Sequence, residues 1–168
     1  PHAEGDDVIA VLAKHSKEPC LIVSSDKDFN QLYKYKKIRQ FSPMRGKMLK
    51  GIDAEAYLKE HIIRGDKGDG IPNILSADDC IVSGERQKPI TKKKVAVWLK
   101  KEREEFEIGM MHGWDRNQEL IDFEYIPPTI VHEVLEQYNE QTPPNRSGLL
   151  NYFVKNRLKM LIEHIGDF

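Results

Sequence analysis

The sequence has few cysteines, almost no net charge and no long apolar run, and each shortage narrows the class of protein. Of its 168 residues only Cys20 and Cys80 are cysteines. They show neither the CxxC spacing of a zinc site nor the even set of a secreted disulfide scaffold. The simplest interpretation is a reducing, cytoplasmic compartment. No stretch approaches the roughly 20 apolar residues that span a bilayer, and the first ten residues do not resemble a signal peptide.

Strong net charge is missing as well. The 26 basic and 27 acidic residues leave a formal net charge of −1, so overall basicity does not indicate a nucleic-acid partner. Any such partner would have to be met by a local group of charges. Because 39% of the residues are hydrophobic, we expect a globular chain with one core, or a small core with a helical appendage.

The apolar pattern predicts an α/β arrangement in the first half and helices in the second. The β-branched run Cys20–Val23 is typical of a fully buried strand in a parallel sheet. Strands are expected at 20–23, 38–41 and 48–49. Helices are expected after Glu4, at 28–33, after the N-cap residue Asp53, from Pro128 and from about Ser147.

Two acids directly follow the first predicted strand. In an extended segment Asp26 and Asp28 point the same way, roughly 6–7 Å apart, at about 3.3 Å per residue. Each could therefore face one ion of a metal pair, and ligands of parallel sheets bind beyond the carboxyl ends of strands. The alternative is an Asx turn that caps the helix at Asp28, which explains one acid and leaves the other unaccounted for.

Two further acidic pairs lie at the ends of predicted elements. Glu4 and Asp6 begin a helix, where the alternative role is to complement the helix dipole. Asp66 and Asp69 lie in the stretch GDKGDGIP, which could equally be an ordinary turn. Carboxylates that cluster at 4 Å repel by roughly 4 kcal/mol at an effective dielectric near 20, and a divalent cation removes that cost. Oxygen ligands favour magnesium or manganese.

The histidines do not join these pairs in the sequence. The histidines at positions 2, 15, 61, 112, 132 and 164 are scattered through segments whose pattern is typical of ordinary helices. They are interpreted as surface or core residues rather than as ligands.

In order and spacing, the three acidic motifs resemble those of the flap-endonuclease type 5′ nucleases. The motifs are EGDD at 4–7, SSDKDF at 24–29 and GDKGDGIP at 65–72. Three further segments, QFSPM at 40–44, IDFEYIP at 121–127 and YFVK at 152–155, are similar to the phage ribonuclease H group of that family. The resemblance covers essentially the whole chain.

The resemblance implies a fold and a domain organisation. Residues 1–84 would be the C-terminal part of a parallel-sheet, PIN-like nuclease core, and residues 85–168 a mainly helical DNA-binding and C-terminal region. The GDKGDGIP loop would begin a helix-turn-helix that grips the duplex backbone. Gly70 and Pro72 depart from the usual family pattern there, so the basic residues could take over the phosphate grip. These are Arg86, Lys88, Lys92, Lys93 and Lys94, whose alternative role is a solvated face.

The resemblance also implies an activity: a Mg2+-dependent 5′ to 3′ nuclease with two ions, for which Mn2+ may substitute. Its substrates would be RNA–DNA primers and flapped or duplex DNA in phage replication, in the cytoplasm of an infected bacterium. The implied catalytic and metal-binding residues are Glu4, Asp6, Asp26, Asp28, Asp66 and Asp69. By family analogy Glu4 and Asp6 would lie nearest the first ion, and Asp28 and Asp69 nearest the second.

Full-length members of that family carry an N-terminal half with more strands and two further metal-binding aspartates. We therefore expect this chain to be a C-terminal part that binds ions weakly and cleaves poorly alone. An N-terminal nuclease fragment and a phage single-stranded-DNA-binding protein are implied partners. Two alternatives stay open: a non-catalytic DNA-binding or complementing subunit of a split nuclease, and a magnesium-binding α/β domain of the phosphatase or receiver type.

Overall fold

A computed structural model describes residues 3–142 and 146–168. The chain forms two compact units, which divide between Leu135 and Glu136, and each is considered by itself. The fold is mixed α/β and about half helical. The boundary at residue 84 between a nuclease core and a helical DNA-binding region concerns function rather than compactness, and it stays a prediction.

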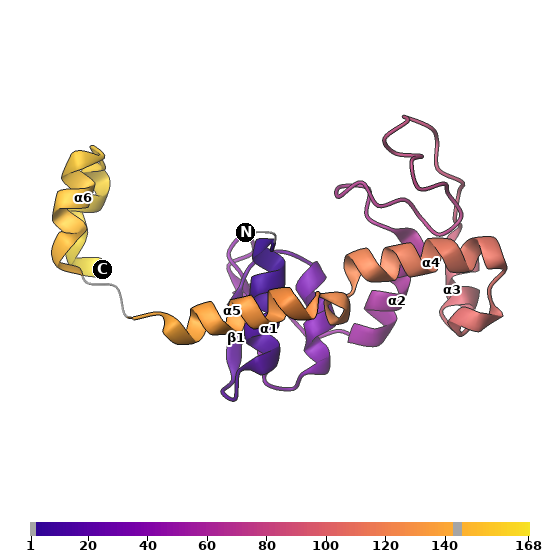
Figure 1. Cartoon of the computed structure of the whole chain (residues 1–168), viewed down its shortest axis with the longest axis horizontal. Helices are drawn as coiled ribbons and strands as arrows, with labels where there is room; N and C mark the ends of the chain where they lie inside the picture. The colour runs from indigo at the N-terminus through magenta and orange to yellow at the C-terminus, as the bar shows by residue number, and fades with distance from the viewer. Residues whose placement is uncertain (1–2, 143–145) are drawn as a thin grey trace. The chain divides into compact units, whose positions relative to one another are not determined.

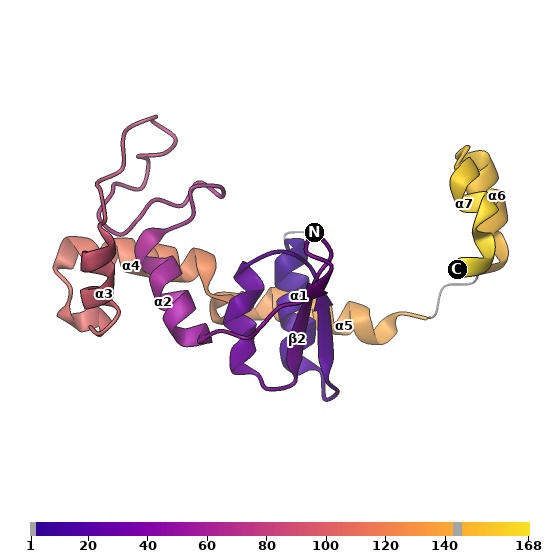
Figure 2. The ribbon, with the colours of Figure 1, turned by 180° about the vertical axis from the view of Figure 1, so that it is seen from behind.

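The first unit contains a small three-stranded sheet. Strand β1 (Cys20–Val23) pairs in parallel with β2 (Ile38–Ser42), and β2 pairs in antiparallel fashion with β3 (Lys47–Met48). The first two predicted strands are confirmed, and the third begins one residue before the prediction. Helix α1 (Gly5–His15) covers one face of the sheet, and Figure 2 views the strands from the other face.

The prediction that residues 20–23 form a fully buried strand is wrong. Ile22 is buried against α1, but Leu21 and Val23 are 52% and 63% exposed. Alternate residues of a strand point to opposite faces, and in the described part of the chain only one face of this sheet is covered. Strand β1 also lies at the edge of the sheet, since β2 is its one partner among the described residues.

Two apolar clusters build the core of the first unit. One gathers Ile22, Phe29 and Ile38 beneath α1, and the other gathers Ile63 and Trp114 with their neighbours. Helix α2 (Ala54–Arg64) connects them, because it packs against both the 3₁₀ helix η1 (Asp28–Lys34) and helix α4 (Ile108–Ile121). Figure 1 shows α2 beside α4. The predicted N-cap of α2 is confirmed: Asp53 accepts from the N–H of Ala56 at 3.0 Å.

A long connection follows α2. From residue 65 to residue 91 the chain forms turns and loops, and the next helix is α3 (Lys92–Trp98), followed by the 3₁₀ helix η2 (Arg103–Glu105). The expectation that the GDKGDGIP loop itself begins a helix is therefore wrong. Gly70 has a φ of +77° and Pro72 lacks a backbone N–H, and both oppose a regular helix at this point.

The end of the chain is helical, as predicted, but more interrupted. Helix α5 (Pro128–Glu140) begins at the predicted proline, after the short 3₁₀ helix η3 (Phe123–Tyr125). The prediction of one continuous helix from about Ser147 is wrong, because Arg157 adopts a φ of 56° and separates two helices. The elements after α5 are η4 (Arg146–Gly148), α6 (Leu149–Lys155), α7 (Lys159–Glu163) and η5 (Ile165–Asp167). None of the helices, over the residues described, is long and apolar enough to cross a membrane.

Glu124 ties together the elements that flank the predicted acidic motifs. Its carboxylate accepts from Lys14 on α1 at 2.6 Å, from Lys34 at 2.6 Å and from the Tyr35 hydroxyl at 2.7 Å. Burial alone would raise the pKa of Glu124, but these three donors outweigh it and lower the pKa to about 2. Helix α1 and η1 are thereby held to the segment that follows α4.

We predict that Glu124→Gln lowers the stability at neutral pH by about 1 kcal/mol, because the amide keeps the shape but loses the charge-assisted bonds. The folded-state pKa lies below the ordinary value of about 4.3. This contribution is therefore present above about pH 4.3 and is lost as the pH falls through about 2. Urea unfolding of both proteins between neutral and acidic pH should show the difference shrinking. Glu18→Gln, at an exposed position without an ion pair to any described residue, is the matched control; a difference for Glu124→Gln that does not change with pH would contradict the assignment.

Candidate functional site

Five of the six predicted site acids line one cavity of about 310 Å³ in the first unit. They come from the start of α1, the start of η1 and the loop after α2. The predicted acids that line it are Glu4, Asp6, Asp28, Asp66 and Asp69, and three further acids, Asp7, Glu119 and Asp122, line it as well. Asp26 is not among the lining residues, but its charge helps to raise the pKa of Asp6, so it flanks the same cavity.

The backbone around Asp26 is fixed by local hydrogen bonds. Its carboxylate accepts from the N–H of Asp28 at 2.9 Å, which is the Asx turn that the sequence offered as an alternative. The buried side chain of Gln40 on β2 donates to the carbonyl oxygens of Ser24 at 2.9 Å and Asp26 at 2.6 Å. The turn and the site are thus compatible, because the turn holds Asp28 at the rim of the cavity.

The tightest group in the cavity consists of Asp28, His61 and Asp66. Their ligand atoms all lie within 4.8 Å of one another. The Nε2 atom of His61 is 3.1 Å from Asp66 Oδ2, and its Nδ1 atom is 3.5 Å from Asp28 Oδ1. Two neighbours complete the group, since the Tyr57 hydroxyl donates to Asp28 Oδ1 and Lys27 Nζ donates to Asp66 Oδ2, each at 3.0 Å.

The protonation of these acids follows their surroundings. Burial raises the pKa of Asp28, and His61 and Tyr57 oppose this only in part. Burial and the neighbouring charges of Asp26, Asp28, Glu4 and Asp7 raise the pKa of Asp6. Burial also acts on Asp66, but hydrogen bonds from Lys27, the Gly68 N–H and His61 lower its pKa to about 2. The cavity therefore combines one firmly ionised carboxylate with others that gain from an added cation.

The glycines of GDKGDGIP serve the loop that carries Asp66. Gly65 has a φ of +66°, and a Cβ atom there would lie 2.4 Å from the carbonyl oxygen of Ile71 and 2.5 Å from that of Pro72. The N–H of Ile71 closes the loop on the Asp66 carbonyl at 2.7 Å. Only glycine fits this crossing of the chain, and it turns Asp66 back toward His61.

Sequence reasoning missed His61, which it treated as an ordinary helical histidine. The residue is 7% exposed, and in the described structure its Nδ1 atom is buried without a hydrogen-bond partner. One signal was available: Tyr57 and His61 are four residues apart on α2, on one helix face, directly before the Gly-Asp of the loop. Their rings lie 5.6 Å apart.

The donor set fits a divalent cation. Clustered carboxylates offer the hard oxygen ligands that Mg2+ and Mn2+ prefer, and the buried Nδ1 atom of His61, which forms no hydrogen bond in the described structure, lies 3.5 Å from Asp28 Oδ1. Asp28 and Asp66 could hold the ion, with His61 as a third ligand or as a donor to both. Lys27 now supplies the positive charge beside Asp66, and an ion would share or take over that role.

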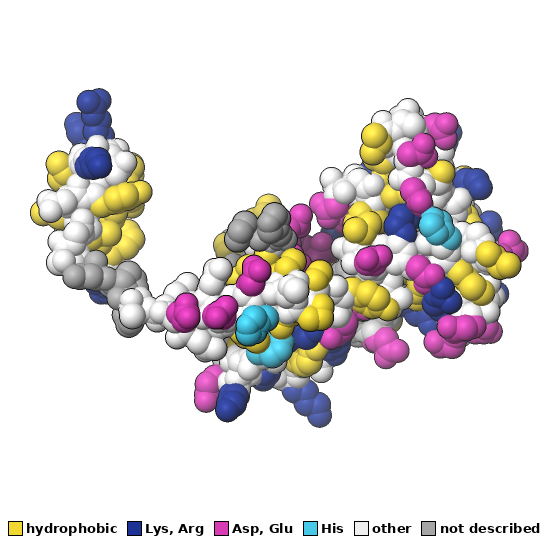
Figure 3. Space-filling view, in the orientation of Figure 1, with side chains coloured by type: hydrophobic (Ala, Val, Ile, Leu, Met, Phe, Trp, Pro, Cys, Tyr) yellow, Lys and Arg dark blue, Asp and Glu magenta, His cyan; other side chains and the backbone are white. Residues whose placement is uncertain are grey.

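The predicted basic residues all lie at the surface of the first unit. Arg86 and Lys88 line a cavity of about 580 Å³, which we call the loop cavity. Arg64 and Lys67 line it too, and the sequence analysis had not predicted these two residues as part of a basic group. Lys92, Lys93 and Lys94 are exposed on α3, and Lys94 lies 5.9 Å from the centroid of the Trp98 ring. On the face seen in Figure 3 acidic and basic side chains are interspersed, so the positive character is local.

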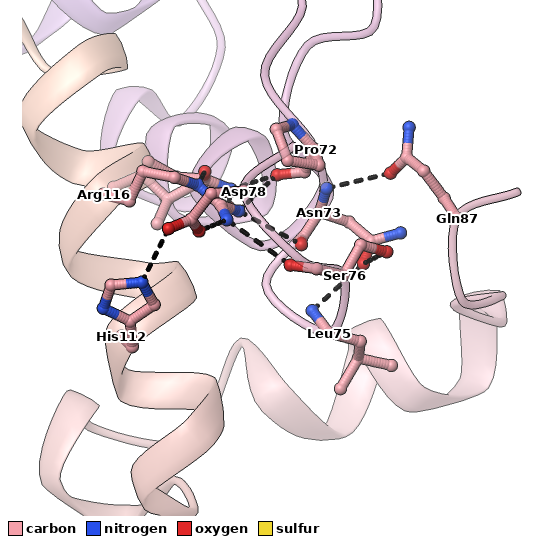
Figure 4. Close-up of polar contacts among 10 residues, drawn as sticks. Pro72, Asn73, Leu75, Ser76, Asp78, Gln87, His112 and Arg116 are labelled. Atoms are coloured by element: carbon pink, nitrogen blue, oxygen red, sulfur yellow. Dashed lines mark hydrogen bonds and ion pairs between the residues drawn. The ribbon is translucent and has the colours of Figure 1, made fainter. Parts of the chain in front are cut away.

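A polar network shapes the loop cavity by holding its wall against α4 (Figure 4). Arg116 donates to the carbonyl oxygens of Pro72 at 2.8 Å and Asn73 at 3.3 Å. Asn73 in turn donates through its side chain to the Lys88 carbonyl at 2.9 Å, and its N–H donates to Gln87 Oε1 at 2.9 Å. The segment with Arg86 and Lys88 is therefore fixed although it contains no helix.

Comparison with known proteins identifies the class. Residues 52–168, more than half of the chain, match the family described as "T4 RNase H, C terminal", and the chain belongs to this family. A curated relative, "Ribonuclease H" of Enterobacteria phage T4, is 35% identical over 177 residues, which cover 98% of this chain and 58% of the relative. The chain thus spans a little over half the length of the curated relative that it matches, and corresponds to a C-terminal part of it. The predicted resemblance is confirmed.

We predict that Asp28→Asn and Asp66→Asn each weaken Mn2+ binding by about tenfold or more, because each removes a charged ligand from the tightest group in the cavity. Isothermal titration of the whole chain measures this, with unfolding curves to check that the variants are folded. Asp79→Asn, at an exposed loop position without an ion pair to any described residue, should leave Mn2+ affinity unchanged. Equal affinity in all three variants would remove Asp28 and Asp66 from the metal site.

Proposed function

We propose that the chain is part of a divalent-metal-dependent 5′ nuclease, which hydrolyses phosphodiester bonds. The observation that carries the proposal is the meeting of five predicted site acids from three separate segments in one cavity, in a chain whose family takes its description from a ribonuclease H. The finer assignment, a PIN-like parallel-sheet core, is supported by the parallel pair β1 and β2, with Asp26 and Asp28 directly beyond the carboxyl end of β1.

The residues have distinct proposed roles. Two Mg2+ ions, which Mn2+ can replace, would be held by six acids: Glu4, Asp6, Asp26, Asp28, Asp66 and Asp69. Tyr57 positions Asp28 through its hydroxyl, and Lys27 keeps Asp66 ionised before the ion arrives. When bound, two such metal ions supply an activated water and neutralise the charge that develops during an in-line displacement at phosphorus.

The proposed substrates are RNA–DNA primers and flapped or duplex DNA in phage replication, with exonuclease and flap-endonuclease cleavage both within the chemistry of the site. The alternative is a non-catalytic DNA-binding or complementing subunit. The ion pair between Lys27 and Asp66 favours this alternative in one respect, because the lysine compensates the negative charge of Asp66 without a metal. An assay of cleavage by the chain distinguishes the nuclease from the non-catalytic subunit.

We expect cleavage of a 5′-flapped DNA and an RNA–DNA duplex in Mn2+ or Mg2+, weak with the chain alone and stronger when a polypeptide supplies the remaining part of the T4 relative. Asp28→Asn should lower the rate by at least about a hundredfold, since it removes a metal ligand, and Asp79→Asn should not. Product analysis on gels measures both. Metal binding without cleavage, even with the added polypeptide, would favour the non-catalytic subunit.

We further propose that the predicted basic residues contact DNA phosphates. Arg86, Lys88 and Lys92 to Lys94 are exposed, and none of them forms an ion pair within the described residues. Their charge is therefore available to a polyanion. A phage single-stranded-DNA-binding protein as a partner stays a proposal from family analogy alone.

We predict that the double variant Arg86→Gln, Lys88→Gln weakens duplex DNA binding equally for different sequences. The slope of log affinity against log salt should fall by about one unit for each phosphate that the variant no longer neutralises. Fluorescence anisotropy at several salt concentrations, with the metal chelated, measures it. The pair Lys17→Gln, Lys36→Gln makes the same charge change at exposed positions elsewhere in the unit. An unchanged slope would mean that Arg86 and Lys88 form a solvated face and do not contact DNA phosphates.

A further inference from the structure

A third cavity, of about 390 Å³, lies beside the β2–β3 hairpin, and none of the assignments above uses it. We call it the hairpin groove. Four cations line it, Lys27, Arg45, Lys47 and Lys50, and no acid does. Its volume lies in the range of about 300–1,000 Å³ found for ligand pockets, so one nucleotide unit of a strand fits.

Three of these cations are without counter-charges. Arg45, Lys47 and Lys50 are exposed and form no ion pair with any residue that the structure describes. Like charges that surround one hollow without an acid produce a positive potential there. The chemistry that fits is an anion, and several cations in a row suit a polyanion better than a single charge.

Hydrogen bonds of the hairpin fix the backbone that carries Arg45 and Lys47. The N–H of Leu49 donates to the Gln40 carbonyl at 2.8 Å, and the N–H of Arg45 donates to the Ser42 carbonyl at 3.2 Å. The hydroxyl of Ser25 lies 2.8 Å from that of Ser42 and accepts from the Met44 N–H at 3.2 Å. Ser25 directly precedes Asp26, so the hairpin is tied to the acidic motif.

The hairpin groove and the loop cavity are linked by residues that they share with a small cavity beside the acidic group. Lys27 lines both the groove and a small cavity of about 240 Å³, which His61 and Arg64 also line. Arg64 in turn lines the loop cavity. Cations therefore occur on each cavity from Arg45 to Lys88, although the two that link the cavities are paired, Lys27 with Asp66 and Arg64 with Glu60.

We propose that the hairpin groove binds a single-stranded segment of nucleic acid whose neighbouring phosphodiester lies in the acidic cavity. Its phosphates would pair with Arg45, Lys47 and Lys50. Met48 and Ile52 line the same groove and are 43% and 47% exposed, so they offer apolar contact to a base. A duplex stacks its bases inside and has no use for such a surface, whereas an unpaired strand does. The inference rests on the proposed nuclease function for the position of the reacting bond.

The test uses a fluorescent oligothymidylate and the whole chain, in EDTA so that no cleavage occurs. The triple variant Arg45→Gln, Lys47→Gln, Lys50→Gln should bind it about tenfold or more weakly. The salt slope should fall by about 2, at roughly 0.7 for each phosphate contact on a single strand. The triple variant Lys17→Gln, Lys36→Gln, Arg39→Gln removes the same charge elsewhere in the unit and should change neither quantity. Lys50→Gln alone, after β3, keeps the test available if the triple variant does not fold.

Matched ligands distinguish the possible occupants. Blunt duplex DNA should lose little affinity in the hairpin triple variant, and Ile52→Ala should weaken binding of the oligothymidylate but not of an abasic strand of equal length. Equal losses for duplex and single strand, or for the two triple variants, would overturn the proposal in favour of general electrostatics. Thymidine monophosphate that binds as tightly as the oligonucleotide would overturn it in favour of a single-nucleotide site.

The outcome is independent of the nuclease proposal, because binding is measured without metal. If the chain never cleaves but the oligothymidylate result holds, the proposed function fails and the groove stands. If cleavage is observed and the hairpin triple variant binds the oligothymidylate normally, the groove fails and the proposed function stands.

Discussion

Repulsion among carboxylates is the constraint on which the structure around the cavity depends. Two such charges at 4 Å cost roughly 4 kcal/mol at an effective dielectric near 20, and Asp28 and Asp66 belong to one group within 4.8 Å. The chain offsets this cost with His61 between them and with Lys27 on Asp66. Asp28 forms no ion pair with a lysine among the described residues, and burial raises its pKa although the charges of His61 and Lys27 oppose this. The two acids therefore differ in how much they gain from a cation.

Such a group stays together only if the segments that carry it are rigid, and buried polar residues provide that rigidity. Gln40 fixes the turn before Asp28. Gln31 on η1 donates to the Ile121 carbonyl and accepts from the Phe123 N–H, each at 3.0 Å. These bonds satisfy backbone groups that burial would otherwise leave unpaired. The walls of the cavity are thus joined by hydrogen bonds rather than by apolar packing alone.

The sequence predicted the features that are local and missed those that depend on distant contacts. The cap at Asp53, the start of α5 and the acids at the ends of elements follow from spacing within a few residues. His61 was missed because one of its partners, Asp28, lies 33 positions earlier. Whether Leu21 is buried depends on what covers the sheet, and the break at Arg157 depends on a single backbone angle. Neither can be read from apolar periodicity.

The two central acidic motifs share one feature, which bears on how an acidic cavity could act on the proposed anionic substrate. Each carries a lysine beside its acids: Lys27 stands between Asp26 and Asp28, and Lys67 follows Asp66. Lys27 lines the hairpin groove and Lys67 the loop cavity. A polyanion repelled by the carboxylates would meet the cations of these neighbouring cavities, whose long-range attraction does not depend on a metal. In the proposed function the acids would hold the ions, and the cations that line the neighbouring cavities would hold the strand. A chain with a net charge of −1 would then bind nucleic acid through local groups of cations rather than through an overall basic surface.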